Sequence, residues 1–522
     1  MKLEFESGLI PDEIYRELDF EGYLSSFEKS IPAIPHCVLR VLSESEAEER
    51  FNRLAKLDSG IDAHGIDTGG LLQKAGEIPS LGAMLPFFQK GLLEPFHLFD
   101  LGRFLKKNHS LEILERAVPV PDKEKVCRKI HQDLMAWTTE DFTGIKCNRE
   151  EVALRNAINL LEEKTAAALS NIEQEIFRET GLKLIYPYPR EVRKDDESLD
   201  RIDKCRHLEL KDEGAFFRVD YHLNRTVEKL VTEQEKTREE WARLMEEKLK
   251  AVNKTLSAHL DAFLTYYEKR KQRLLDYAFL AVKKAHGLCF PEFVGASVVS
   301  LKKGCLPVLM NRSPDRYNPL DLELNKGVNL LFGANMTGKT TVLKTLYFHL
   351  ALVKFGLPVP AESFSLPCLN RFGLQLKSSG DTGRGLSGFA DELRFFSRSA
   401  DPLSVFLVDE MFHSTDPVNG VSLSEAFLEG LRGSENIYLC TSHYPEVLNI
   451  PGVRFLKMKD FEGDLESCDL DELLESVPYE VEEISAGELK SVVKHNKKPL
   501  QIALHFSLPE TIKKMIRKKL RE

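Results

Sequence analysis

Residues Gly327 to Lys344, with the sequence GVNLLFGANMTGKTTVLK, constrain the fold of this chain more than any other stretch. The mostly apolar run Val328 to Phe332 has the length and composition of a buried parallel strand. The octet Gly333 to Thr340 follows at once and fits the pattern G-x-x-x-x-G-K-[ST]. Apolar residues then recur at helical spacing from Val342 to Leu350. Strand, glycine-rich turn and helix therefore occur in the order that a phosphate-binding loop requires.

The chemistry of such a loop comes from its backbone, its lysine and its last hydroxyl. Glycines let backbone N–H groups turn towards phosphate oxygens, and the helix N-terminus adds a favourable dipole. Lys339 is expected to neutralise the β- and γ-phosphates, and Thr340 to offer its hydroxyl to Mg²⁺. The pattern thus predicts a site for a nucleotide and Mg²⁺, the alternative being a glycine-rich turn without a ligand. The residues expected to contact the nucleotide are Gly333, Ala334, Asn335, Met336, Thr337, Gly338, Lys339, Thr340 and Thr341.

Two further strands are predicted to end in polar residues at the same edge of a sheet. Val405 to Val408 is apolar and is followed by Asp409 and Glu410. Asp409 is the expected second ligand of Mg²⁺, and Glu410 is placed to orient or deprotonate the attacking water. An acidic pair after a strand is common in any protein, so this interpretation depends on the phosphate loop that precedes it.

The third strand is Ile437 to Thr441, followed by Ser442 and His443. A lone histidine after a strand is usually structural. Because this strand tip would reach the same edge as the phosphate loop, His443 is interpreted as a catalytic sensor of the γ-phosphate.

A glycine-rich stretch, Ser379 to Glu392, lies between these elements in the sequence. Its simplest interpretation is a flexible surface loop. The functional alternative is a loop that offers Ser387 and backbone amides to a phosphate bound by a second subunit.

Composition sets the broad class of protein. The chain has 522 residues, of which 30% are charged, and a formal net charge of −10. It has no apolar run of the roughly 20 residues that a membrane helix needs, and its acidic start, MKLEFESGLIPDE, lacks the features of a signal peptide. The nine cysteines include no C-x-x-C pair. We expect a cytoplasmic protein of several domains that does not contact a membrane. The net negative charge argues against a protein that binds nucleic acid over its whole surface.

Four consecutive segments are predicted from changes in periodicity and composition. Residues 1–148 are expected to form a mainly helical core domain, and residues 149–289 a lever with two long antiparallel helices joined by a charged, loop-rich excursion. Residues 290–460 are expected to form an α/β domain with a mostly parallel sheet, and residues 461–522 a tail that ends in a helix from Pro509 to Arg521.

These motifs resemble those of the MutS ATPases. GANMTGKTT is similar to the phosphate loop GPNMGGKST of that family, and VFLVDE and TSHY match its metal-binding strand and its histidine switch. The stretch from Ser379 to Phe389 matches its signature loop, with Ser387 in the serine position. The resemblance implies an ABC-type P-loop ATPase domain that works as a homodimer or heterodimer, in which Ser387 completes the ATP site of the partner in trans and Glu410, Lys339 and His443 act in catalysis.

The chain also departs from the family pattern. Phe412 and His413 replace a Gly-Arg pair, Asn419 replaces an Asp, and Leu386 stands where an Arg is usual. The mismatch-reading module of the family is not recognised, and nothing in the first 80 residues is expected to substitute for it. The excursion between the long helices is too short for a full DNA clamp. The resemblance therefore supports the expectation of ATP hydrolysis by this chain more directly than the expectation that it recognises mismatched DNA.

Two functions are consistent with this pattern. The short excursion between the long helices and the net negative charge favour an ATP-driven remodelling factor. Such a factor would be similar to the MutS-like reactivases of adenosylcobalamin-dependent aminomutases such as lysine 5,6-aminomutase. The alternative is an ATPase that binds mismatched or branched DNA in repair or recombination. A non-hydrolysing scaffold is disfavoured because Lys339, Asp409 and Glu410 are all present.

Overall fold

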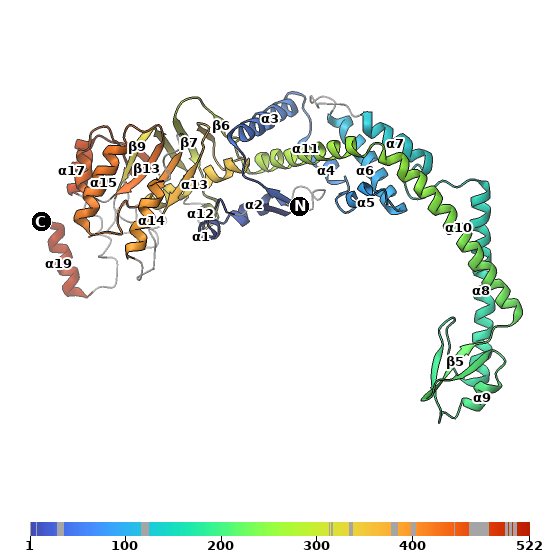
Figure 1. Ribbon diagram of the computed structural model, residues 1–522. Coiled ribbons are helices and arrows are strands. Elements are labelled where there is room, and N and C mark those ends of the chain that lie inside the picture. The colour runs from blue at the N-terminus through green and yellow to red at the C-terminus, as the bar shows by residue number, and fades with distance from the viewer. Residues whose placement is uncertain are drawn as a thin grey trace. The chain divides into compact units, whose positions relative to one another are not determined.

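In the computed structural model the chain forms two compact units. Figure 1 labels many of their helices and strands. Unit 1 contains residues 1–78, 108–121 and 268–522, and unit 2 contains residues 79–107 and 122–267. The four consecutive segments expected from the sequence stay a prediction. The structure describes residues 2–6, 8–28, 36–115, 125–312, 314, 317–333, 338–376, 385–397, 403–442, 444–458, 480–495, 500, 504 and 509–521.

Unit 1 combines helices with two larger sheets. Its helices are α1 (Asp12–Glu17), α2 (Phe20–Glu28), α3 (Glu44–Ala63), α4 (Thr68–Gly76), most of α11 (Leu260–His286), α12 (Pro307–Arg312), α13 (Lys339–Lys354), α14 (Gly385–Ser397), α15 (Pro417–Leu431), the 3₁₀ helix η3 (Pro445–Asn449), α17 (Ala486–His495) and α19 (Glu510–Arg521). Its strands are β1 (Lys2–Phe5), β2 (His36–Leu39), β6 (Glu292–Phe293), β7 (Val298–Gly304), β8 (Leu320–Asn325), β9 (Gly327–Phe332), β10 (Ser363–Leu366), β11 (Phe372–Gln375), β12 (Val405–Val408), β13 (Ile437–Ser442), β14 (Arg454–Met458) and β15 (Val481–Glu483).

The sheet that carries the predicted site has the order β11-β12-β13-β9-β14-β15. The first five strands of this order are parallel to one another, and β15 pairs antiparallel with β14. A second sheet, of order β6-β10-β7-β8, lies in the same unit. The parallel order brings the carboxyl ends of β9, β12 and β13 to one edge.

The central strands are buried along their whole length. Every residue of β9, β12 and β13 is buried, which explains why these segments appear as continuous apolar runs in the sequence. On one face, Leu330, Val408 and Cys440 belong to a core shared with α14, α15 and η3. Helix α13 contacts β11 and β12, and most of its side chains are buried. The sheet is therefore covered by helices on both faces.

The N-terminal segment packs against α13 and the loop that follows it. The hydroxyl of Tyr23 donates to the carbonyl of Pro358 at 2.7 Å, and Lys344 forms an ion pair with Glu17. Phe5 stacks on Phe355 with ring centroids 3.9 Å apart. Residues far from the nucleotide motif in sequence thus cover the helix that begins at the phosphate loop.

Unit 2 contains the long helices. Its elements are α5 (Leu85–Gln89), most of α6 (Pro95–Leu114), α7 (Lys125–Trp137), α8 (Arg149–Thr180), β3 (Arg190–Arg193), α9 (Leu199–Lys204), β4 (Leu208–Asp212), β5 (Phe216–Tyr221) and α10 (Arg225–Ser257). Helix α8 begins with a capping box at Asn148 and ends at Gly181, which has φ 76°.

The two longest helices of unit 2 are antiparallel, as the sequence predicts. Glu151 near the start of α8 pairs with Lys248 near the end of α10 at 2.6 Å. Glu162, farther along α8, pairs with Arg238, which comes earlier in α10. The helices lie side by side in Figure 1, with β5 and α9 at one end of the pair.

The excursion between α8 and α10 is more structured than the sequence indicated. A loop-rich span with one short strand was expected, but the structure has a three-stranded antiparallel sheet of order β3-β5-β4 and the short helix α9. Val192, Ile202 and Val219 from these elements form a core with Ile172 and Ile176 of α8. A few buried aliphatic residues among many charges are enough to order this segment, and their spacing was hidden by the charges around them.

A membrane-spanning helix is not found in the described part of the chain.

We predict that His349 makes the stability of α13 fall at acid pH. Burial lowers the pKa of this imidazole below its usual value of 6.5, although its ring nitrogens lie 2.7 Å and 3.2 Å from the carbonyl oxygens of Thr345 and Pro360. The unfolded chain therefore binds a proton that the folded chain does not, and stability present above pH 6.5 is lost as the pH falls below it, by up to about 1.4 kcal/mol per pH unit.

Hydrogen-exchange protection factors of peptides covering residues 339–354 should show this loss between pH 7 and pH 5.5. A His349→Gln variant should lack that component, whereas His286→Gln, at an exposed position, should retain it. Equal pH dependence in the parent and the His349→Gln variant would contradict the prediction.

Candidate functional site

The candidate site lies where three parallel strands end. Phe332, the last residue of β9, pairs with Ser442, the last residue of β13. Val408, the last residue of β12, pairs with Cys440 of the same central strand. The residues that follow β9 and β12 therefore emerge beside the end of β13, as parallel pairing requires.

The described ends of the glycine-rich turn have the geometry of a strand-to-helix connection. Gly338 has φ 89°, a left-handed conformation that glycine adopts without strain, and α13 begins at the next residue. The Nζ atom of Lys339 donates to the carbonyl of Gly333 at the other end of the turn. Lys339 is 5% exposed, and its ammonium group therefore faces the turn through this hydrogen bond.

A buried carboxylate connects three elements of the site. The Thr340 hydroxyl, in the first turn of α13, donates to Asp409 Oδ2 at 2.8 Å. The Thr441 hydroxyl, on β13, donates to Asp409 Oδ1 at 2.9 Å. The Asp409 backbone N–H donates to the carbonyl of Gln375 at the end of β11, also at 2.8 Å. The two residues predicted to bind Mg²⁺ are thus in direct contact.

Glu410 follows with an unusual backbone conformation. Its φ is 50°, a region that non-glycine residues occupy at a cost on the order of 1 kcal/mol. Its backbone N–H donates to the Thr441 hydroxyl at 2.7 Å, and the N–H of Met411 donates to the Thr441 carbonyl at 3.2 Å. Thr441 therefore holds both Asp409 and the start of the segment after it.

The structure brings Lys339, Thr340, Asp409 and Glu410 to one edge, but it does not test their roles, which stay predictions. Thr341 is in the first turn of α13. Ser387 is in the first turn of α14, so the end of the glycine-rich stretch is helical and not a loop. The side chain of Ser387 lies outside the described part of the structure, as do Ala334, Asn335, Met336, Thr337 and His443.

Sequence reasoning missed three residues near this site. Thr441 was treated only as the end of a strand, although it contacts Asp409 and Glu410. Glu392 and Ser414 form a hydrogen bond beside the segment after Glu410. A threonine immediately before Ser442 and His443 was the available signal for the first, whereas no local pattern indicates the other two.

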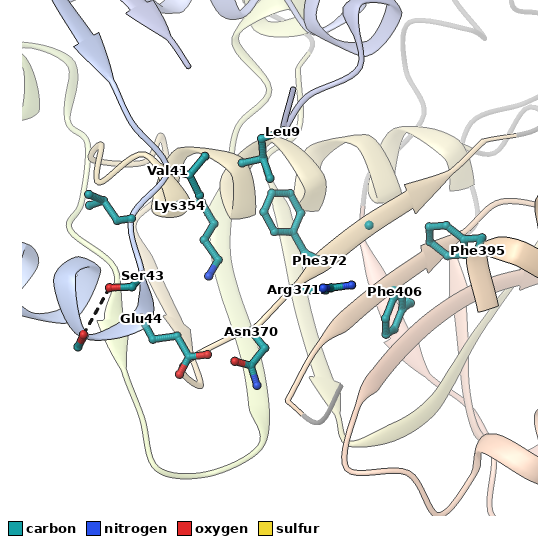
Figure 2. A pocket seen from close by; sticks show the side chains of 13 residues that line it. Leu9, Val41, Ser43, Glu44, Lys354, Asn370, Arg371, Phe372, Phe395 and Phe406 are labelled. Atoms are coloured by element: carbon teal, nitrogen blue, oxygen red, sulfur yellow. Dashed lines mark hydrogen bonds between the residues drawn. The ribbon is translucent and has the colours of Figure 1, made fainter. Parts of the chain in front are cut away.

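A cavity of about 760 Å³ lies elsewhere in unit 1. Figure 2 shows Lys354, at the end of α13, together with Asn370, Arg371 and Phe372 at the start of β11. This is the amino edge of the sheet, opposite the strand ends that carry Asp409. None of the predicted ATP-site residues is among the described residues of its lining. The size of this cavity therefore does not locate the nucleotide, and the convergence of polar groups at the carboxyl edge is the better guide.

The parallel sheet and these strand ends have the arrangement expected of a P-loop domain. Residues 329–516 match the family model described as MutS domain V. An endonuclease MutS2 from Solidesulfovibrio magneticus is 31% identical over 230 residues, which cover 40% of this chain and 30% of that protein. A DNA mismatch repair protein MutS from Thermus thermophilus is 31% identical over 197 residues, which cover 36% of this chain and 24% of that protein.

A more distant relative extends this similarity to a eukaryote. The DNA mismatch repair protein MSH3 from Cryptococcus neoformans is 27% identical over 169 residues, which cover 31% of this chain and 14% of that protein. The chain thus matches less than a third of the length of each of these relatives. Together with the domain match, they show that part of this chain is similar to MutS proteins.

The names of these relatives bear on the two functional hypotheses. They describe mismatch repair proteins and an endonuclease, which fits the DNA-processing alternative better than the aminomutase reactivase. The reactivase interpretation relied on the short excursion between the long helices and on the net charge, and neither feature identifies an aminomutase client.

We predict that Thr441→Val weakens Mg²⁺-dependent nucleotide binding by about tenfold. The substitution preserves shape but removes the donor to Asp409 and the acceptor for the Glu410 N–H, and unmatched buried polar groups cost about 1–3 kcal/mol. Titration with a fluorescent ATP analogue, with and without Mg²⁺, measures the change. Thr345→Val is the matched control, because this equally buried hydroxyl donates only to the carbonyl of Thr341 within α13. Equal affinities of the two variants would contradict the assigned role.

Proposed function

We propose that this chain binds ATP with Mg²⁺ at the carboxyl edge of the six-stranded sheet and hydrolyses it to ADP and phosphate. The observation that carries the proposal is the contact between Thr340 and Asp409 at 2.8 Å, which joins the first turn of α13 to the residue that follows β12. The similarity of residues 329–516 to MutS domain V supports the same conclusion.

The residues at this edge suit Mg²⁺. The ion prefers oxygen ligands and usually takes one or two from the protein and the rest from phosphates and water. A hydroxyl from Thr340 and a carboxylate from Asp409 supply that donor set from two different elements. When bound, the ion would neutralise charge on the β- and γ-phosphates.

The other residues of the site have distinct roles in this proposal. Lys339, held within the turn, balances phosphate charge. The Glu410 carboxylate orients a water whose oxygen attacks the γ-phosphorus, and it accepts the proton as the bond to the bridging oxygen of ADP breaks. His443, which directly follows β13, is proposed to donate to a γ-phosphate oxygen.

We also propose that the active form is a homodimer or a heterodimer with a related subunit. Ser387 lies in the first turn of α14, at the amino end of a helix where N–H groups favour an anion. In this arrangement Ser387 and the adjacent amides act on the nucleotide of the partner subunit. ATP then changes how the two ATPase domains associate.

We propose that the ATP-dependent change in how the two ATPase domains associate is coupled to the binding of DNA. Two of the named relatives are DNA mismatch repair proteins, and mismatched or branched duplexes are therefore the first ligands to test. The proposal concerns ATP-dependent binding by the whole chain and does not assign a DNA-contacting residue.

One observation favours a protein client as the second candidate. Residues 149–257 contain 21 Lys and Arg residues against 24 Asp and Glu residues. Cations of the three-stranded sheet pair with carboxylates of the same unit, as in Lys194 with Asp212, Lys211 with Asp220, and Arg218 with Asp220. Residues 149–257 therefore have no excess of positive charge that would favour binding to a phosphate backbone. A protein client such as an aminomutase is the second candidate for this reason.

We predict that Glu410→Gln retains nucleotide but lowers turnover by about two to four powers of ten, because glutamine cannot accept the proton from water. Steady-state phosphate release and binding of a fluorescent ATP analogue separate the two effects. Glu429→Gln, an exposed position on α15, should match the parent in both assays. Turnover of Glu410→Gln at the parental rate would remove Glu410 from the mechanism.

We predict that the Glu410→Gln protein, loaded with ATP, binds mismatched or branched DNA at least tenfold more tightly than plain duplex. Filter binding across a range of salt concentrations measures both affinities, and a steep salt dependence shared by all duplexes indicates only backbone contacts. Lys339→Ala is the control, because it should impair ATP binding and thus the ATP-dependent component. If the parent chain hydrolyses ATP but the ATP-loaded variant binds all duplexes equally, a protein client is favoured.

A further inference from the structure

A buried carboxylate on α14 is not used by the proposed reaction. Glu392 is 4% exposed, which is rare for a charged side chain without a specific role. Its Oε1 atom accepts a hydrogen bond from the Ser414 hydroxyl at 2.6 Å and lies 3.4 Å from His413 Nδ1. Its Oε2 atom is buried and has no hydrogen-bond partner among the described residues.

His413 connects this carboxylate to the backbone of Glu410. The His413 Nδ1 atom lies 3.1 Å from the Glu410 carbonyl oxygen, and the backbone N–H of His413 donates to the same oxygen at 3.3 Å. Nδ1 therefore lies within reach of two acceptors, one on Glu410 and one on Glu392. Ser414, the next residue, donates to the same Glu392 oxygen.

The segment that these contacts hold has a strained backbone. Glu410 and Phe412 have φ values of 50° and 54°, although neither is glycine. Such conformations persist only where the surrounding structure holds them. Thr441 holds the start of the segment through the Glu410 N–H, and His413 holds the Glu410 carbonyl. The direction of the Glu410 side chain therefore depends on both contacts.

We infer that Glu392 and His413 form a positioning pair that holds Glu410 in its working orientation and makes that orientation depend on α14. The inference rests on the proposed ATPase function and deepens it. Ser387 and Glu392 are five residues apart on the same helix, about 7 Å along its axis. A shift of α14, whose amino end is proposed to serve the partner's nucleotide, thus reaches Glu410 through the contact of Glu392 with His413 and the contact of His413 with the Glu410 carbonyl.

The surroundings of Glu392 agree with a functional role. Tyr444, which follows His443, has a raised pKa because of burial and, to a smaller extent, because of the negative charge of Glu392, Glu410, Asp416 and Glu446. Glu392 therefore lies in the same electrostatic environment as the proposed base and the segment after β13.

The experiment compares Glu392→Gln, His413→Ala and the double variant with the parent chain. Each single variant should lower kcat about tenfold while the Kd for a fluorescent ATP analogue stays within twofold, because the pair positions Glu410 and does not contact the nucleotide. The double variant should be no slower than the slower single variant, because both substitutions break the same connection. Asp391→Asn is the matched control, since the neighbouring Asp391 is exposed and pairs with Arg394.

Three outcomes overturn the inference. A parental kcat in Glu392→Gln does so if Glu410→Gln has lost turnover, and this result leaves the ATPase proposal intact. Parallel losses of kcat and nucleotide affinity would show a merely structural role, as would additive effects in the double variant. If Glu392→Gln does not fold, Ser414→Ala replaces it, with an expected drop in kcat of about threefold at unchanged Kd. A parental rate in Glu410→Gln instead removes Glu410 from the mechanism, and a parent chain that does not turn over ATP removes the proposed function itself.

Discussion

The Asp409 carboxylate is the group on which the arrangement of the site depends. It is 6% exposed, and burying an ionised carboxylate is unfavourable unless hydrogen bonds replace those of water. Thr340 and Thr441 supply these bonds from α13 and β13, and the carbonyl of Gln375 accepts the Asp409 N–H. One charge thus aligns the helix that begins at the phosphate turn, the strand that leads to His443 and the strand that precedes Glu410. Without it, the three strand ends would share an edge but not a common centre.

Local sequence patterns predicted the parts of the site that depend on strand burial. Val405–Val408 and Ile437–Ser442 are strands because apolar runs of this length suit strands that are buried on both faces, and the polar residues after them mark the sheet edge. Thr441 was not predicted as part of the site, because its role depends on register. Cys440 pairs with Val408, and this places the next residue of β13 beside Asp409, 32 positions earlier in the chain. No periodicity in the sequence contains that alignment.

The N-terminal segment shows the same limit on a larger scale. Tyr23 and Pro358 are separated by 335 positions and share a buried hydrogen bond, and Phe20 packs on Phe348 with ring centroids 4.7 Å apart. Sequence periodicity indicated helices in this region but not the surface that they cover. Because they cover α13, displacement of the N-terminal segment would disturb the helix whose first turn carries Lys339 and Thr340. Long-range packing, and not a local motif, therefore gives these residues an influence on the nucleotide site.

The replacement of glycine by Phe412 has an energetic explanation. A left-handed conformation costs a non-glycine residue about 1–2 kcal/mol, whereas full burial of a phenylalanine contributes about 2–3 kcal/mol. Phe412 is 0% exposed and packs with Phe396 of α14 and Phe427 of α15, at centroid distances of 5.7 Å and 4.9 Å. The aromatic contacts offset the backbone strain and fasten the segment to both helices. A glycine at this position would let the segment move alone, but Phe412 makes it move with α14 and α15. If the active form is the proposed dimer, a signal between its two sites would have to displace these helices together with Glu410.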